Sequence, residues 1–520
     1  MAIVAAQGVW QVIADRAVAT PDLVLGVDDR GRSLTCRAFA DGAERLAAGL
    51  VAHGIGPGSK VSWQLPTNFE SMMLSAALAR LGAVQNPIIP IYREREVGFC
   101  VRQTEADLVI VPHELRGFDF EAMVRPIAAS VPGCEVLVFA GEPGAGGEPD
   151  GDPAVLPPLP VVPLPPADAR WIYYTSGTTS DPKGAMHTDA SVIASAMNMV
   201  RALELSEADN WPLVFPFTHV GGIGLLLASL IAGPKLVVSD TFDPAVTPLF
   251  LAEHDITIAG SGAYFFMSYL AAQAEGPDQP LFPNLRCATG GGSVTPVGLH
   301  HRVKQELGGR GIMSSYGLTE IPIVTFANYG DPDDKLDTTE GRAVPGYDFK
   351  VIDASGAEAP AGIEGELLVR GPSQCLGYLD SSLDAAAFDD DGYFRTGDLG
   401  IIDREGYISI TGRAKDVIIR NGENISARAV EDLLFTHPKI REVAAIGLPD
   451  ERTGERCCAV VALADQATAI DLSEIRTYLR GKGLMMQMVP EQVEFLPSLP
   501  RNPAGKILKK DLRAQFAPAS

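Results

Sequence analysis

A loop rich in hydroxyl groups and glycine carries the chemical groups that bind phosphate. Residues 173–184 read YYTSGTTSDPKG and continue an apolar stretch that begins at Trp171. Backbone N–H groups, hydroxyls and one ammonium can surround phosphate oxygens in such a loop. It is not a Walker A motif, because Lys183 lies between Pro182 and Gly184 and lacks a following hydroxyl residue. The expected phosphate ligands are Thr175, Ser176, Gly177, Thr178, Thr179 and Lys183.

Four later segments contain further groups suited to a nucleotide or an acid. They read SYGLTE at 315–320, YFRTGDLG at 393–400, GRAKD at 412–416 with NGEN at 421–424, and PRNPAGK at 500–506. Together with the phosphate loop, and in the same order, they resemble the signatures of the adenylate-forming superfamily. This superfamily contains acyl-CoA synthetases, aryl-CoA ligases, luciferases and the adenylation domains of peptide synthetases. The resemblance covers the chain from about residue 170 to residue 510.

The resemblance implies a site for the nucleoside of ATP. It places adenine between the flat ring of Tyr316 and a glycine triplet, where the backbone can approach a planar base closely. It assigns the ribose hydroxyls to Asp398, with Arg413 as a second contact on that side. The three glycines are Gly290, Gly291 and Gly292. Without the resemblance, the triplet would indicate a tight turn, and Asp398 between its neighbours would indicate a turn former.

The resemblance also implies catalytic roles for three side chains. Thr319 is expected near the α-phosphate, and Glu320 is expected to bind Mg²⁺ together with Thr175, because this hard cation prefers oxygen ligands. Lys506 is expected to bridge the substrate carboxylate and the α-phosphate as negative charge develops between them. By composition alone, Lys506 would be one exposed lysine among several near the C-terminus.

A hinge would let one site perform two reactions. Lys415 stands at the hinge position of the superfamily, and hinges are short segments that absorb backbone rotation. Rotation there would withdraw Lys506 after adenylation and bring the segment around Gly422 to the site, where it would line a channel for the thiol of coenzyme A. The resemblance thus implies ATP and coenzyme A as co-substrates.

The segment FPFTHVGG at 215–222 resembles the part of the superfamily that lies beside the acyl group. His219 would lie near the carboxylate, although a lone histidine is more often a core residue. Relatives that activate amino acids carry an aspartate here for the substrate ammonium, and this segment has none. A hydrophobic acid is therefore expected. The predicted acyl pocket contains His219, Val220, Gly221, Gly222, Leu225, Gly262, Ala263, Gly317, Leu318, Ile321 and Pro322.

Composition excludes some classes of protein. The formal net charge of −23 argues against nucleic-acid binding, which depends on lysine and arginine contacts with phosphate. Seven cysteines without a C-x-x-C pair fit neither a disulfide framework nor a zinc site, so a reducing cytoplasm is expected. Residues 211–234 lack charge, but their prolines and paired glycines predict a strand, a loop and a core helix over 225–231 instead of a transmembrane segment.

Alternating helical and extended patterns predict an α/β fold. We expect a large N-terminal AMP-binding domain over residues 1–411, with two layered α/β sheets and a β-rich subdomain after Gly341. A small mobile α/β domain over residues 412–520 would carry Lys506. Expected elements include a helix over 69–81, strands over 255–259 and 406–410, and a helix capped by Ser426. The proline-rich residues 141–166 are predicted to be neither helix nor central strand.

These features predict an AMP-forming acyl-CoA synthetase. Its substrate would be a small-molecule hydrophobic carboxylic acid: medium-chain, alicyclic or steroid-derived. The alternatives are a stand-alone ligase that loads a carrier protein, an aryl-CoA ligase, and a nucleotide-binding regulator without turnover. The presence of both Glu320 and Lys506 argues against the regulator. No pattern in the chain indicates an oligomeric state.

Overall fold

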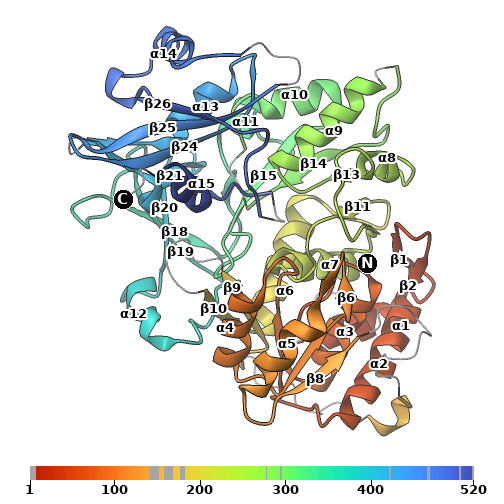
Figure 1. The fold of residues 1–520 in the computed structure, drawn as a ribbon. Helices are drawn as coiled ribbons and strands as arrows, with labels where there is room; N and C mark the ends of the chain where they lie inside the picture. The colour runs from red at the N-terminus through yellow and green to blue at the C-terminus, as the bar shows by residue number, and fades with distance from the viewer. Residues whose placement is uncertain are drawn as a thin grey trace.

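The computed structural model describes residues 8–139, 151–156, 168–175, 182–276, 278–292, 295–420, 423–464, 469–502 and 505–517. Three sheets with their helices and a fourth, antiparallel sheet build the large part of the molecule, and the last hundred residues form a smaller α/β part, blue in Figure 1. The predicted α/β fold with a large first part and a small last part is confirmed.

The first sheet carries the phosphate-loop strands at one edge. Its strand order is β10 (Lys183–His187), β9 (Trp171–Thr175), β4 (Val84–Pro87), β3 (Lys60–Trp63), β5 (Leu108–Val111) and β8 (Glu135–Val138). All neighbours pair in parallel except β9 and β10, which form an antiparallel hairpin. The helices of this region are α1 (Val9–Ala19), α2 (Cys36–Ala52), α3 (Phe69–Leu81), α4 (Glu94–Thr104) and α5 (Phe120–Ala129).

Two further sheets continue the α/β layers. The second has the order β11 (Asn210–Leu213), β12 (Lys235–Val238), β1 (Val24–Asp28) and β2 (Ser33–Thr35). The third has the order β13 (Ile258–Ala259), β14 (Cys287–Gly290), β15 (Ile312–Tyr316), β16 (Thr325–Phe326) and β17 (Arg342–Ala343). A hydrogen bond of 3.1 Å from the N–H of Thr257 to the carbonyl of Asn210 joins the two. One hydrophobic core extends through the first three sheets.

The helices around these two sheets include the one predicted in the charge-free stretch. They are α6 (Asp189–Ala202), α7 (Val220–Ala232), α8 (Thr247–Ala252), α9 (Ala263–Glu275), α10 (Leu299–Glu306) and α11 (Asp333–Thr338). Helix α7 lies almost wholly in the core, as predicted. Among the described helices, none has both the length and the apolar character that a membrane crossing needs.

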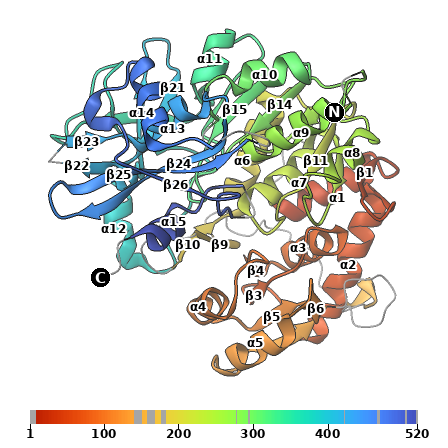
Figure 2. The same ribbon diagram turned by 45° about the horizontal axis from the view of Figure 1, so that its top comes forward.

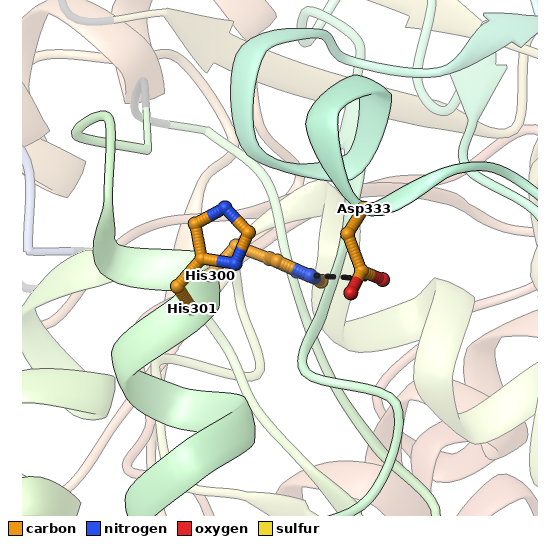
Figure 3. A group of neighbouring side chains, drawn as sticks. All are labelled: His300, His301 and Asp333. Atoms are coloured by element: carbon orange, nitrogen blue, oxygen red, sulfur yellow. Dashed lines mark ion pairs between the residues drawn. The ribbon is translucent and has the colours of Figure 1, made fainter.

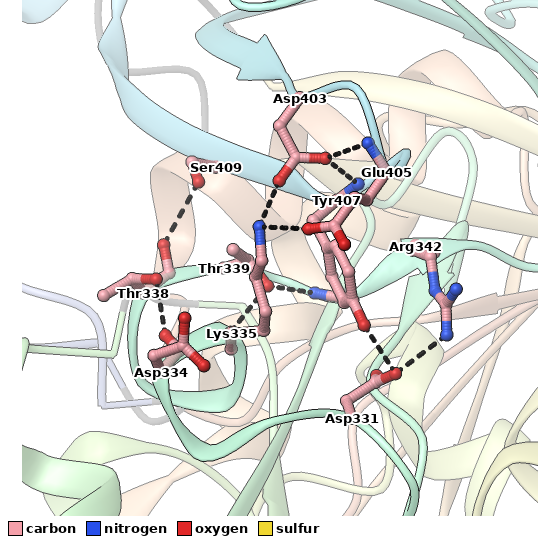
Figure 4. Close-up of polar contacts among 11 residues, drawn as sticks. Asp331, Asp334, Lys335, Thr338, Thr339, Arg342, Asp403, Glu405, Tyr407 and Ser409 are labelled. Atoms are coloured by element: carbon pink, nitrogen blue, oxygen red, sulfur yellow. Dashed lines mark hydrogen bonds and ion pairs between the residues drawn. The ribbon is translucent and has the colours of Figure 1, made fainter.

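The fourth sheet is antiparallel and fits the β-rich region predicted after Gly341. Its order is β18 (Asp348–Ile352), β19 (Gly365–Arg370), β20 (Phe394–Ile402) and β21 (Ile408–Arg413), and α12 (Asp384–Ala387) precedes β20. A polar network fastens the turn between β20 and β21 to α11 and β17 (Figure 4). In it, Lys335 binds Asp403 and Glu405, while Tyr407 and Arg342 each donate to Asp331 over 2.8 Å.

The last sheet is buried on both faces. Its path is β23 (Glu423–Ile425), β22 (Ile418–Arg420), β25 (Gly454–Leu463) and β24 (Ile440–Asp450), and β26 (Gln492–Phe495) pairs with β25. The helices α13 (Ala427–Phe435), α14 (Leu472–Gly481) and α15 (Lys509–Phe516) belong to this part. Alternate residues of β25 enter two separate cores, so Cys457 and Cys458 face opposite sides of the sheet. Figure 2 shows α13 next to β24 and α14.

The chain passes from the fourth sheet to the last sheet through one short turn. Strand β21 continues to Arg413, which pairs with Asp398 of β20. A single 3₁₀ turn, Ala414–Asp416, then leads into β22. The change of sheet therefore lies two residues beyond the predicted division after residue 411. The division into a large domain and a small mobile domain stays a prediction.

Local signals explain which predicted elements match the structure. Helix α3 has the predicted bounds, because Asn68 and Ser71 form a capping box and Gly82 ends the helix in a left-handed conformation. Ser426 caps α13 as predicted. The strand expected over 255–259 is shorter, because Asp255 has a φ of 51° and breaks the extended backbone. The strand expected over 406–410 begins only at Ile408, after a turn at Gly406.

The proline-rich region is described only in part. The sequence predicts neither helix nor central strand for residues 141–166. Within the described residues 151–156, residues 153–155 form a 3₁₀ turn, which departs from that prediction. The rest of that region lies outside the described residues.

Candidate active site

The hairpin of β9 and β10 brings the two described ends of the phosphate loop together. Thr175, the last residue of β9, pairs directly with Lys183, the first residue of β10. The predicted ligands Ser176, Gly177, Thr178 and Thr179 lie outside the described residues. Any ligand held between Thr175 and Lys183 would therefore lie at the end of this hairpin.

A distant segment covers the edge of β10 and places a tyrosine beside Lys183. The N–H of Met186 donates to Gly377 over 3.0 Å, and the N–H groups of Leu376 and Leu379 each bond back to β10 over 2.8 Å. Tyr378, in the middle of this segment, has its ring centroid 5.2 Å from the ammonium of Lys183. A cation over an aromatic face is attracted by the ring quadrupole.

The same tyrosine holds Glu320. The hydroxyl of Tyr378 donates to the Glu320 carboxylate over 2.7 Å, and the backbone N–H of Cys375 donates to the Glu320 carbonyl over 2.8 Å. Burial and the adjacent carboxylate raise the pKa of Tyr378 far above its usual value, so the hydroxyl keeps its proton. Glu320 is itself buried. Tyr378 thus contacts Lys183 with the face of its ring and Glu320 with its hydroxyl.

A buried histidine holds the neighbouring Thr319. The Nε2 atom of His187 lies 2.8 Å from the carbonyl oxygen of Thr319, and Nδ1 lies 3.0 Å from the hydroxyl of Ser191. Burial lowers the pKa of His187 to about 4, so the ring is neutral at physiological pH. The carbonyl can only accept, so Nε2 must carry the proton. His187, the last residue of β10, therefore connects the hairpin to the turn that contains Thr319.

The predicted adenine and ribose residues meet where β14 and β15 end. Gly290 pairs in parallel with Ser314, and a Cβ added at Gly290 would lie 2.8 Å from Cα of Gly262. One added at Gly291 would lie 2.9 Å from the carbonyl oxygen of Ser315. Side chains here would displace the backbone, so glycine is required for the close approach. Gly292 has a left-handed φ of 77°.

Tyr316 and Asp398 share one polar cluster. The Tyr316 hydroxyl donates to Oδ2 of Asp398 over 2.6 Å, and Nε of Arg413 donates to Oδ1. Asp398 and Arg413 are also paired residues of the antiparallel strands β20 and β21. The structure thus brings Tyr316, Asp398 and Arg413 into direct contact.

Lys506 reaches the same cluster from the last part of the chain. Burial lowers its pKa to about 8, and the positive charges of Arg413 and Lys415 act in the same direction. Asp398 and Asp416 act in the opposite direction. The ammonium therefore lies within electrostatic reach of the predicted ribose residues.

His219 caps helix α7 and faces a small cavity. Its Nδ1 accepts the N–H of Gly221 over 3.1 Å, and burial lowers its pKa to about 4. The neutral ring therefore carries its proton on Nε2 and acts as a donor. Gly222 is required in this turn, because an added Cβ would lie 2.2 Å from the carbonyl oxygen of Phe217. The cavity is lined by Pro87, Ile88, Ile89, Tyr92, Cys100, Tyr173, Tyr174, Thr218, His219, Val220 and Thr319.

The other predicted pocket residues do not line this cavity. Leu225 is buried inside α7, and Gly262 and Ala263 begin α9 beside Gly290. Leu318 and Ile321 exchange two backbone hydrogen bonds of 3.2 Å and close a tight turn around Thr319 and Glu320. Gly317 permits that turn, since an added Cβ would lie 2.3 Å from the N atom of Ile323. The carbonyl of Pro322, which follows the turn, accepts the hydroxyl of Ser373 over 2.7 Å.

The hinge prediction can be placed only in part. Lys415 lies in the turn between β21 and β22, where burial and Arg413 lower its pKa. Gly422 lies outside the described residues.

Two groups of side chains can be considered as metal ligands. Glu320 and Thr175 offer carboxylate and hydroxyl oxygens near Tyr378 and Lys183, and this donor set fits Mg²⁺. The second group is His300, His301 and Asp333, whose ligand atoms lie within 4.8 Å of one another (Figure 3). There, Asp333 already binds the cations Lys304 and Arg310, which disfavour another positive charge. His300 also contacts Ile312, at the opposite end of β15 from Tyr316.

Three residues of this region were not anticipated from the sequence. They are His187, Tyr378 and Tyr264, the last of which contacts the loop that carries Lys506. The pair Gly377–Tyr378 follows the predicted β-rich segment, but a single sequence gives no sign that its ring lies beside Lys183. The roles assigned to the other site residues stay predictions.

Comparisons with known proteins identify the family of the chain. The family model described as AMP-binding enzyme matches residues 13–379, and the model of the C-terminal domain of that enzyme matches residues 429–506. A medium-chain fatty-acid–CoA ligase of Escherichia coli is 32% identical over 98% of this chain and 91% of its own length.

A second relative and a solved structure are similar over nearly all of the chain. The 3-[(3aS,4S,7aS)-7a-methyl-1,5-dioxo-octahydro-1H-inden-4-yl]propanoyl:CoA ligase of Rhodococcus jostii is 30% identical over 94% of this chain and 95% of its own. The crystal structure of ATP-bound MatB from Rhodopseudomonas palustris superimposes with a TM-score of 0.86 at 27% identity. The match covers 98% of this chain and 99% of that one.

Proposed function

The chain belongs to the AMP-binding enzyme family and is an AMP-forming acid–thiol ligase, and we propose that it converts a hydrophobic carboxylic acid into its coenzyme A thioester. The acid would be medium-chain, alicyclic or steroid-derived. The single observation that supports a working site best is that Lys506, from the end of the chain, lies within electrostatic reach of Asp398 and Arg413, which bind each other and Tyr316 in the large part.

In the first reaction, a carboxylate oxygen of the acid attacks the α-phosphorus of ATP, and the bond to the β-phosphate breaks to release pyrophosphate. The reacting groups are both anions, so positive charge and positioning lower the barrier most. Lys183 would neutralise the phosphates, and Lys506 would stand between the carboxylate and the α-phosphate. Tyr316, Asp398 and Arg413 would hold the nucleoside.

Magnesium fits the oxygens of Glu320 and Thr175 and would supply further neutralisation of phosphate charge. Tyr378 would orient Glu320 for this role through its hydrogen bond of 2.7 Å.

In the second reaction, the sulfur of coenzyme A attacks the carbonyl carbon of the acyl-adenylate, and AMP leaves. The neutral His219 would donate from Nε2 to an oxygen of the acyl group, because its Nδ1 is occupied by the N–H of Gly221. Lys506 is not needed in this step. The division 1–411 and 412–520 would then correspond to a fixed domain and a domain that reorients between the two reactions.

A hydrophobic acid is supported by the kinds of side chain beside His219 and Thr319, although the cavity between them has a volume of only about 10 Å³. Its lining contains apolar and aromatic side chains and no aspartate or glutamate among the described residues. A substrate ammonium would find no counter-charge there, and an unpaired buried charge is very costly. Amino acids are therefore disfavoured as substrates.

A panel of acids tests the proposal. The purified chain is incubated with ATP, Mg²⁺, coenzyme A and single carboxylic acids of linear, alicyclic, steroid-side-chain, aryl and α-amino type. AMP release and thioester formation are measured together. We expect both to depend on a hydrophobic acid and to be absent with amino acids.

Other outcomes would replace this proposal with a named alternative. Acid-dependent AMP release without consumption of coenzyme A, but with acylation of a carrier protein, would indicate a carrier-loading ligase. ATP binding without AMP release from any acid would indicate a nucleotide-binding regulator.

A further inference from the structure

An aromatic side chain of the large part lies directly under the loop that carries Lys506. A Cβ added at Gly505 would lie 3.1 Å from Cβ of Tyr264 and 3.7 Å from its ring. The guanidinium of Arg501 lies 5.5 Å from the centroid of the same ring. Gly505 is buried and has a φ of 81°, so both its backbone and its missing side chain favour this close contact.

Hydrogen bonds among the described residues of this loop, 501, 502, 505 and 506, hold these residues together. Arg501 donates to the carbonyl of Gly505 over 2.6 Å and to the carboxylate of Glu442 in β24 over 2.8 Å. The N–H of Asn502 donates to the carbonyl of Lys506 over 2.8 Å, and the N–H of Lys506 returns to the Asn502 side chain over 2.9 Å. The backbone of Lys506 therefore moves with Arg501 and Gly505.

Tyr264 is itself held in place next to the nucleotide residues. It is the second residue of α9, and its ring packs edge-on against Phe242 and Phe265, with centroids 5.7 Å and 5.6 Å away. Gly262, which precedes α9, touches Gly290 of the predicted adenine triplet. A loop docked on Tyr264 is thereby aligned with the nucleotide end of β14.

The charges around Lys506 act in both directions, so they do not by themselves hold the loop in place. Arg413 and Lys415 repel the ammonium, whereas Asp398 and Asp416 attract it. The face of the Tyr264 ring attracts the guanidinium of Arg501, so this contact draws the loop toward the large part.

We propose that Tyr264 is a positioning residue for adenylation: its ring is the surface on which the Arg501 and Gly505 loop docks, so that Lys506 enters the site. The contact acts in the first reaction and is released for the second. This inference rests on the proposed two-step function.

Separate assays of the two reactions test the inference. Tyr264→Ala is expected to slow acid-dependent exchange of pyrophosphate into ATP by about tenfold to hundredfold, since a misplaced catalytic group loses its alignment. Thiolysis of a chemically prepared acyl-adenylate by coenzyme A should stay within twofold of the unmodified protein. Tyr264→Phe keeps the ring and should restore exchange. Phe495→Ala, which removes a 43% exposed aromatic ring from β26, is the matched control and should change neither rate.

A second variant reports on the same contact from the loop. Arg501→Ala also removes the bonds to Gly505 and Glu442, so it should slow exchange selectively and at least as much as Tyr264→Ala. The double variant should be no slower than Arg501→Ala, because Tyr264 acts only through the loop that Arg501 holds. Equal slowing of both reactions by Tyr264→Ala, or additive effects of the two substitutions, would overturn the inference. So would an unchanged rate of exchange.

A measurement without an acid separates this inference from the proposed function. Amide hydrogen exchange of the peptide that contains Lys506 is followed with a non-hydrolysable ATP analogue. The peptide should be less protected in Tyr264→Ala than in Tyr264→Phe. If no acid supports pyrophosphate exchange, the proposed function fails while this measurement still decides whether the loop docks on Tyr264. Equal protection in the two variants would refute the docking.

Discussion

The candidate site has a fixed half and a docked half, and they are held by different kinds of contact. The fixed half contains Tyr316, Thr319, Glu320 and Asp398, whose partners are buried groups on neighbouring strands and turns of the large part. The docked half is the loop that carries Lys506, which meets the large part through Gly505 and Arg501 on one aromatic ring.

This difference predicts which half serves which reaction. The hydrogen bonds of the fixed half join residues up to 132 positions apart and would break only with local unfolding. The docked half belongs to a part of the chain that is connected to the fourth sheet through the short turn Ala414–Asp416. Damage to the fixed half should therefore impair both reactions, and damage to the docked half should impair only adenylation.

The largest expected effect comes from removing the ammonium of the docked half. Lys506→Ala should slow acid-dependent pyrophosphate exchange by about a hundredfold to a thousandfold, as is typical when one group that stabilises transition-state charge is lost. Thiolysis of a prepared acyl-adenylate should stay nearly unchanged. Lys510→Ala removes an exposed lysine four residues away and serves as the control. Normal adenylation by Lys506→Ala would show that the lysine is wrongly assigned.

A smaller effect on both reactions is expected at Tyr378. Tyr378→Phe keeps the ring beside Lys183 but removes the hydroxyl that donates to Glu320. A hydrogen bond to a buried carboxylate contributes about 1.5–3 kcal/mol, so exchange should slow by about tenfold to hundredfold and need more Mg²⁺ for saturation. Initial rates over a Mg²⁺ titration measure both changes.

The control for this substitution uses a similar hydrogen bond elsewhere. Tyr407 also donates to a buried carboxylate, that of Asp331, in the network of Figure 4. Tyr407→Phe should lower the melting temperature about as much as Tyr378→Phe does. It should not change the Mg²⁺ concentration that is needed for saturation. An equal change in Mg²⁺ requirement in both variants would refute a specific role for Tyr378.

Much of the fold was predictable because its signals are local. The bounds of α3 follow from a capping residue, a partner three positions later and a glycine after the last turn. The site motifs are likewise short runs of residues, and Thr175, Lys183 and Tyr316 lie at the ends of strands. A short run of residues does not indicate which distant residues it will contact, because these contacts depend on how strands and loops pack.

The missed residues illustrate this limit. Tyr378 reaches Lys183 and Glu320 because residues 376–379 pair with the edge of β10. No local sequence pattern indicates this pairing. His187 bonds to a backbone carbonyl in the turn that follows β15, and any buried histidine would look the same in the sequence. Tyr264 matters only because a loop from the far end of the chain rests on it.

The pH dependence of adenylation should show the titration of Lys506, the lysine of the docked half. Burial beside Arg413 and Lys415 lowers the pKa of Lys506 to about 8 in the protein without substrates. The charged form is the active one, so activity is present below this pKa and is lost as pH rises through it. The ratio kcat/KM for pyrophosphate exchange should fall about tenfold per unit well above pH 8.

The second reaction provides the internal control for this profile. Thiolysis of the acyl-adenylate does not use Lys506 and should lack the fall above pH 8, apart from ionisation of the thiol of coenzyme A. Lys506→Arg keeps its charge at high pH, so whatever exchange activity it retains should not decline there. A decline of the same shape in Lys506→Arg would assign the titration to another group.

The smallest effect is expected at His187, which acts on the fixed half through the backbone. His187→Leu leaves the Thr319 carbonyl without its donor, and a typical hydrogen bond contributes about 1 kcal/mol, so both reactions should slow by about fivefold. His300→Leu is the control, because His300 is also buried and bonds to a backbone group, but at the other end of β15. It should lower stability and leave the rates of both reactions unchanged. If His187→Leu slowed adenylation alone, the Thr319 turn would act with the docked half. Thr319 and Glu320 would then have to be assigned to the docked half instead of the fixed half.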